Sequence, residues 1–168
     1  MKRILLLVAA MAAFALAAAA QVPPVYSAVG TLGFGVNGRP DLQNQGFGKI
    51  MSLAAGGEGY VYKGLAFGGD GQFVWPRDSS ENYFGLLSLG PAYHFDDRLN
   101  PRRVVPFVTG GYGLAFREGA TSLYHVGGGV TFWASPRVGF RTEFRYYDNT
   151  RNEFQMNQLR FSLTFRDN

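Results

Sequence analysis

Charged residues at alternate positions give the clearest indication of chemistry in this sequence. Arg141, Glu143 and Arg145 lie two residues apart, and side chains two apart in a β-strand point to the same side of the sheet. Three further charged residues lie on the corresponding face of other expected strands: Glu58, Asp70 and Arg160. Such a set could be catalytic or ion-selecting, but charges enclosed in a small β-structure are costly unless they are paired. We therefore predict a structural network in which the acidic residues pair with the arginines.

Two glycine-rich segments resemble ligand-binding motifs but lack the context that those motifs require. The segment Gly33–Gly38 matches the spacing of a dinucleotide-binding loop, yet a loop containing Pro40 follows where a helix should begin. The segment Gly68–Gly71 is similar to one repeat of a calcium-binding β-roll, but it occurs once and such sites need stacked copies. Strand packing explains both segments better than a bound cofactor does.

The two histidines, His94 and His125, do not form a metal or catalytic motif in the sequence. They fall on different expected strands, and neither has a second ligand at metal-binding spacing. A lipid-A deacylase would need a His-x-Ser arrangement, whereas Val126 and Gly127 follow His125. We predict two interior histidines, no catalytic residue, no metal and no enzymatic activity.

The N-terminal segment predicts export. Lys2 and Arg3 precede an uninterrupted apolar stretch, Ile4–Ala20, which ends in small residues with Ala-x-Ala spacing. We predict that residues 1–20 are a signal peptide cleaved near Ala20, because a transmembrane helix usually carries bulkier residues and a flanking anchor. Cleavage leaves 14 basic residues (16 minus Lys2 and Arg3) against 12 acidic residues. This near balance, without any basic run, argues against nucleic-acid binding.

After residue 20 the composition is typical of a β-protein. Glycine and aromatic residues are abundant, and apolar residues alternate with polar ones in nearly every segment. There is no cysteine, so the exported chain must be held by its own backbone pairing and packing. No serine-rich, proline-rich or highly charged linker divides residues 21–168, and we predict that they form one domain.

Alternation and turn residues predict eight strands. Their expected ranges are 26–36, 51–62, 65–75, 83–95, 104–116, 122–134, 138–147 and 155–165. An even number of strands puts both chain ends on one side. Two of the three connections on that side are very short, and the other four connections are expected to be longer and more polar. Short turns on one side and longer loops on the other are typical of bacterial outer-membrane barrels.

The distribution of residues between the two faces favours lipid outside and charges inside. In the last expected strand, apolar residues from Leu159 to Phe165 alternate with polar residues from Gln158 to Arg166. The charged faces are also rich in glycine and alanine, which make room in a barrel interior only wide enough for side chains. Aromatic residues near strand ends resemble two interfacial girdles: Phe73, Trp75, Tyr83, Phe95, Phe116, Trp133, Tyr146 and Tyr147. The predicted fold class is an all-β, eight-stranded antiparallel up-and-down transmembrane β-barrel.

Three segments, in order along the chain, carry a family resemblance. Val105–Gly113 is similar to a "PYVGAGxGY" strand, Gly127–Val130 is a glycine-rich segment, and Arg141–Tyr147 is similar to "R-x-E-Y-R-Y". Together they resemble the small outer-membrane β-barrel superfamily of bacteria, which includes the OmpA N-terminal domain, the OmpX type and the opacity-type surface proteins. The resemblance covers the chain from Gln21 onward. Members often end on an aromatic residue read by the barrel-assembly machinery, whereas here three residues follow Phe165.

The resemblance implies a location in the outer membrane but no particular activity, because the superfamily contains anchors, adhesins and lipid-A enzymes. We expect an integral outer-membrane protein with a structural or surface-interaction role and no turnover. Its expected partners are outer-membrane lipid and, during insertion, the barrel-assembly machinery, with no nucleic acid; the resemblance identifies no extracellular partner. A narrow gated channel and a soluble periplasmic ligand-binding barrel stay open as alternatives.

Overall fold

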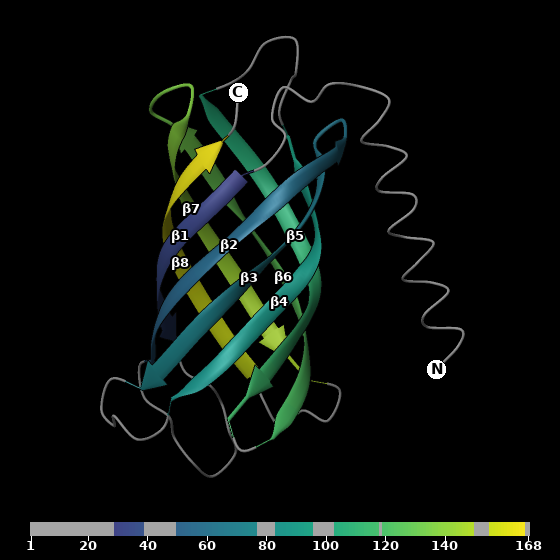
Figure 1. Ribbon diagram of the computed structural model, residues 1–168, viewed down its shortest axis with the longest axis vertical. Helices are drawn as coiled ribbons and strands as arrows, with labels where there is room; N and C mark the ends of the chain where they lie inside the picture. The colour runs from purple at the N-terminus through teal and green to yellow at the C-terminus, as the bar shows by residue number, and fades with distance from the viewer. Residues whose placement is uncertain are drawn as a thin grey trace, which may run out of the picture.

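The computed structural model describes residues 29–38, 50–76, 83–95, 103–117, 119–149 and 155–166, which form eight strands (Figure 1). The strands are β1 (Val29–Gly38), β2 (Ile50–Tyr62), β3 (Leu65–Pro76), β4 (Phe84–His94), β5 (Val104–Phe116), β6 (Ala120–Trp133), β7 (Val138–Asp148) and β8 (Gln155–Arg166). Each begins and ends within three residues of its expected range, so the predicted strands are confirmed. The expected signal peptide, residues 1–20, lies outside the described residues.

The sheet closes on itself into a barrel. Every strand pairs antiparallel with its sequence neighbours, and β1 also pairs with β8, from Val29 opposite Arg166 to Gly38 opposite Asn157. Closure removes the free edges that an open sheet would present. It also lets backbone N–H and C=O groups find partners within the sheet, which a strand structure needs in lipid. Among the described residues, no helix is long and apolar enough to span a membrane.

Residues alternate between an exposed apolar face and a buried, largely polar face. In β8, Leu159, Phe161 and Leu163 are exposed, whereas the intervening Arg160 and Ser162 are buried. The same alternation with period two is seen in β4 and β7. The barrel therefore has apolar side chains on its outside and polar side chains in its lumen, as the sequence predicted.

Two of the aromatic residues assigned to the outer girdles lie inside the barrel instead. Trp133 and Tyr147 are buried, with exposed fractions of 7 % and 0 %. Each occupies an inward position of its strand, since strand geometry alternates regardless of how near the end a residue lies. Tyr147 is also held inside by polar contacts, because its hydroxyl accepts hydrogen bonds from Gln72 Nε2 at 2.9 Å and Arg145 at 3.2 Å. Proximity to a strand end was thus the wrong criterion for these two residues.

One connection is shorter than the sequence predicted. The link between β5 and β6 spans only residues 117–119, although it lies on the side expected to carry the longer loops. Pairing continues to Phe116 opposite Ala120, and the Arg117 amide donates to the Gly119 carbonyl at 3.2 Å. The two strands extend until only a tight turn remains.

The hairpin between β2 and β3 depends on Gly64. Lys63 and Gly64 both have positive φ, 37° and 85°, as in the two-residue turns that match strand twist. The Gly64 carbonyl accepts a hydrogen bond from the His94 amide at 2.8 Å, so the turn also packs against β4. A Cβ at this position would meet the His94 carbonyl oxygen.

Gly64→Ala should lower the free energy of unfolding by about 1–2 kcal/mol, because a left-handed backbone costs that much for a residue with a Cβ. Urea unfolding of the barrel refolded in detergent measures the change. Gly119→Ala is the matched control, since an added Cβ there has no neighbour within 4 Å. Equal losses from the two substitutions would contradict this account of the turn.

Candidate functional site

The charged residues singled out in the sequence lie together in the middle of the lumen. They come from β2, β3, β7 and β8: Glu58, Asp70, Arg141, Glu143, Arg145 and Arg160. All six side chains are at least nine-tenths buried. Burying isolated charges at this depth would be prohibitive, so their partners determine whether the arrangement is stable.

Asp70, Glu143, Arg145 and Arg160 form one half of this lumen network. Arg145 donates from Nε to Glu143 at 2.5 Å and from Nη1 to Asp70 at 2.6 Å. Arg160 donates from Nη1 to the same Asp70 oxygen at 3.1 Å and lies 3.9 Å from Glu143. Each carboxylate therefore faces two guanidinium groups, and the four charges cancel.

Glu58 and Arg141 extend the network toward the end of the barrel that carries the chain termini. Arg141 Nη1 donates to Glu58 Oε1 at 2.7 Å, and Arg141 Nε lies 3.7 Å from Glu143 Oε2. His94 Nε2 lies 3.0 Å from the same Glu58 oxygen. With three carboxylates and three arginines, the six predicted residues are balanced in charge without a bound ion. His94 is an addition that the sequence placed inside the barrel but did not connect to Glu58.

Neutral polar residues continue the network on its other side. Gln72 Nε2 donates to Asp70 at 2.8 Å and to the Tyr147 hydroxyl. Gln158 Nε2 donates to Gln72 Oε1 and to Ser52 Oγ, each at 2.8 Å. These neutral residues were not among the predicted site residues, although their inward positions in alternating strands are a signal that indicates them.

An aromatic group packs against the Glu58 end of the network. The Arg141 guanidinium carbon lies 3.7 Å from the centre of the Phe107 ring, a cation–π geometry. Phe107 also stacks on His94, with ring centroids 5.4 Å apart. The Tyr60 ring lies against His94 as well, with ring centroids 5.0 Å apart. These rings fix Arg141 and His94 by packing as well as by charge.

Glycines in the barrel wall make room for the network. A Cβ added at Gly127 would lie 2.8 Å from Arg145 Cγ, and one at Gly68 would lie 2.6 Å from Glu58 Cβ. A Cβ added at Gly56 would lie 2.5 Å from Asp70 Cβ. Contacts this short would force the side chains to move, so the small residues on the charged face are required by the arginines and carboxylates they face.

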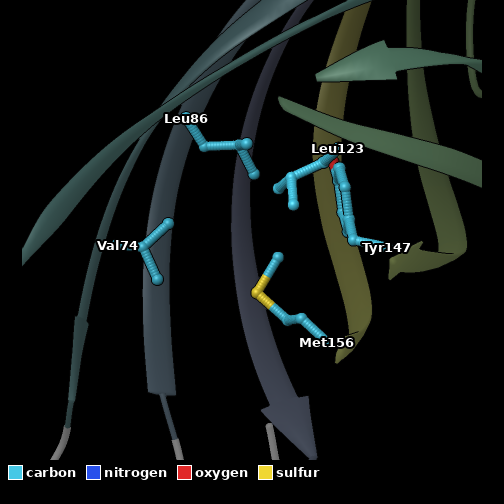
Figure 2. Close-up of a cluster of buried hydrophobic side chains, with 5 residues drawn as sticks. All are labelled: Val74, Leu86, Leu123, Tyr147 and Met156. Carbon is cyan, nitrogen blue, oxygen red and sulfur yellow. The ribbon is translucent and has the colours of Figure 1, made fainter. Parts of the chain in front are cut away.

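Apolar side chains cluster in the lumen above and below the network. Figure 2 shows the layer at the end of the barrel opposite the chain termini, where side chains from five strands meet. We call it the apolar plug: Val74, Leu86, Leu123, Tyr147 and Met156. At the other end, Val105 and Trp133 pack together with Tyr60. Apolar clusters therefore lie in the lumen on both sides of the charged centre.

A small polar cavity lies beside the network, lined among others by Asp70, Ser88, Thr109, His125 and Arg145. His125 Nδ1 is buried and has no protein hydrogen-bond partner among the described residues. No group of three or more His, Asp and Glu side chains in the described part of the chain could hold a metal ion. The geometry suits a stabilising polar core, since the arginines that could bind an anion are engaged by carboxylates.

Comparison with solved structures identifies proteins with a similar fold. The chain superimposes on Neisserial surface protein A with a TM-score of 0.62 and 16% identity, covering 84% of this chain and 97% of that one. The chain has the fold of a small outer-membrane β-barrel. The N-terminal barrel domain of OprF from Pseudomonas aeruginosa also matches, with a TM-score of 0.59, 12% identity, and coverage of 83% of this chain and 98% of that one.

A third similar structure is Ail, the attachment invasion locus protein of Yersinia pestis, with a TM-score of 0.58 and 12% identity. The alignment covers 83% of this chain and 97% of Ail. No protein-family model and no curated protein matches the sequence. At these identities the comparisons show the fold, and the recognition of the small outer-membrane barrel architecture from sequence is confirmed.

Asp70→Asn should destabilise the barrel by about 3–5 kcal/mol, because it removes the closest carboxylate from Arg160 and leaves Arg145 and Arg160 buried with Glu143 as their one shared counter-charge. The substitution keeps the size of the side chain, so the loss reports charge and not a cavity. Urea unfolding monitored by tryptophan fluorescence measures it.

Arg117→Gln is the control for Asp70→Asn. It removes an exposed charge outside the lumen and should change stability by no more than about 0.5 kcal/mol. An Asp70→Asn barrel as stable as this control would show that the network contributes nothing to folding.

Proposed function

We propose that this chain is an integral outer-membrane protein with a structural or surface-interaction role and no catalytic turnover. In this proposal residues 1–20 direct export and are removed, and the barrel-assembly machinery inserts residues 21–168 into the membrane. The single observation that carries the proposal is the continuous apolar outer face of a closed barrel with a charged lumen.

The outer face is too apolar for contact with water. Large apolar side chains around the wall are strongly exposed, among them Leu89 at 61 %, Tyr112 at 78 % and Phe140 at 56 %. Full transfer of one such side chain from water to an apolar environment is worth about 1.5–3 kcal/mol. Lipid supplies that environment without changing the fold. A soluble ligand-binding barrel would need the reverse arrangement, with apolar residues lining its interior.

A role without turnover fits the contents of the lumen. The carboxylates and guanidinium groups are paired with one another, and apolar clusters lie on both sides of them in the lumen. Among the solved neighbours, Ail is named an attachment invasion locus protein, which supports surface interaction as one use of this architecture. In this proposal the connections at the end opposite the termini would make such contacts.

A narrow gated channel is the second candidate, and the charged centre of the lumen supports it. In this candidate, water and ions would pass when the apolar plug, a cluster of packed side chains from five strands, moved aside. The structural role and the channel therefore make opposite predictions about conductance through the unmodified barrel.

Gel mobility of the outer-membrane fraction tests the proposed location. Folded barrels resist detergent at room temperature, so the unboiled protein should migrate differently from the boiled protein. Recovery in the soluble periplasm without any heat-dependent shift would refute an integral membrane protein.

Conductance across planar bilayers tests the closed lumen. The wild-type barrel should give no steady current, whereas Leu86→Ala combined with Met156→Ala should admit ions by removing two side chains of the plug. Leu87→Ala with Met156 unchanged is the control, since Leu87 lies on the outer face. Steady wild-type current that Glu143→Gln alters would establish the channel instead.

A further inference from the structure

The two ends of the barrel differ in charge. At the end that carries the chain termini, the described charged residues outside the lumen network are all basic, and we call them the basic rim: Lys63, Arg103, Arg137 and Arg166. At the opposite end the corresponding residues are Arg117 and Asp148, which balance each other. The connection 96–102, outside the described residues, contains two aspartates and two arginines, and Asp167 offsets one further charge. The excess at the terminal end is therefore about three positive charges.

Each member of the basic rim lies where the apolar outer band ends. Lys63 follows the exposed Tyr62, and its Nζ lies 5.1 Å from the centre of that ring. Arg103 precedes the exposed Val104, and Arg166 follows the exposed Phe165. Positive charge thus begins where apolar surface stops, at the depth where lipid headgroups meet acyl chains.

Three of these basic residues are held on a continuous arc from β5 to β8. The Trp133 amide donates to the Arg103 carbonyl at 2.7 Å, and the Arg166 amide donates to the Arg137 carbonyl at 3.0 Å. The Arg166 guanidinium carbon lies 4.1 Å from the centre of the buried Trp133 ring, so this side chain turns toward the lumen mouth. Lys63, Arg103 and Arg137 are therefore the members of the basic rim that can reach lipid. The arc is therefore placed by backbone pairing and stacking.

Exposed phenylalanines lie on the outer wall below this arc. Phe132 and Phe140 face each other across β6 and β7, with exposed fractions of 46 % and 56 %. An acyl chain can lie against these rings while its headgroup reaches the arginines. A ligand with one anionic end and one apolar end matches both parts of the surface.

We propose that the basic rim binds the phosphate groups of anionic phospholipids in the leaflet at the terminal end of the barrel. Guanidinium groups suit phosphate because their paired N–H donors match its oxygens. Anionic headgroups also attract cationic side chains near the membrane surface, over distances up to about one Debye length. The inference rests on the proposed membrane location and adds a lipid class to it.

Lipid selectivity tests the proposal. The full-length mature barrel is reconstituted in phosphatidylcholine bilayers that contain a trace of spin-labelled phosphatidylglycerol or spin-labelled phosphatidylcholine. The motionally restricted fraction of each label gives its relative association with the protein. Wild-type barrel should prefer phosphatidylglycerol, and Arg103→Gln with Arg137→Gln should lower the preference by up to about fivefold per arginine.

Arg117→Gln is the matched control, because it removes one exposed arginine at the opposite end. It should leave the preference for phosphatidylglycerol unchanged, and a loss equal to the loss per arginine in the Arg103→Gln, Arg137→Gln double variant would overturn the assignment to the terminal end. Absence of any preference in wild-type protein would overturn the proposal itself.

Two further measurements separate the possible failures. Inorganic phosphate added at constant ionic strength should not displace phosphatidylglycerol, because the acyl chains hold the lipid in place. Displacement would make the rim a site for free phosphate and overturn the lipid assignment.

The heat-dependent gel shift is recorded for every variant. A barrel that inserts normally but shows no lipid preference refutes only this inference, whereas failure of wild-type protein to insert refutes the proposed function.

Discussion

The pairing of charges inside the lumen is the interaction on which the rest of the structure depends. Three carboxylates and three arginines are buried in an enclosed space, where an unpaired member would be very costly. Their contacts cross the barrel, since Arg145 on β7 reaches Asp70 on β3. Such pairs form only when the sheet has closed with the right register. Closure and charge pairing therefore stabilise each other.

The network also explains the composition of the wall. Long arginine side chains occupy the centre, so facing wall positions must be small, and glycines such as Gly68 and Gly127 meet that need. With the polar groups inside, apolar side chains face outward, and lipid is the solvent that suits them. Apolar clusters that include Met156 at one end and Trp133 at the other lie on either side of the ion pairs.

Much of this follows from the sequence because strand alternation has a period of two and is read without knowledge of tertiary contacts. The strand number, the inward face and the charged residues near the centre were all evident in this way. Contacts between distant strands could not be predicted in this way. Alternation shows whether a side chain points inward or outward, but it does not show how far along the barrel axis that side chain lies. The pairing of His94 with Glu58 and the bridge through Gln72 depend on register across several strands. Trp133 was wrongly predicted to lie in an outer girdle, because its closeness to a strand end was given more weight than its inward position in the alternation of β6.

The central claim is that this barrel has lipid outside and a polar lumen, and a nitroxide scan along β8 tests it most directly. The chain has no cysteine, so single cysteines can be introduced and labelled one at a time in the reconstituted protein. Labels at Leu159, Phe161 and Leu163 should be accessible to oxygen dissolved in lipid, and labels at Ser162 and Thr164 should be protected. The opposite phase of alternation, with the even positions exposed to lipid, would contradict the account.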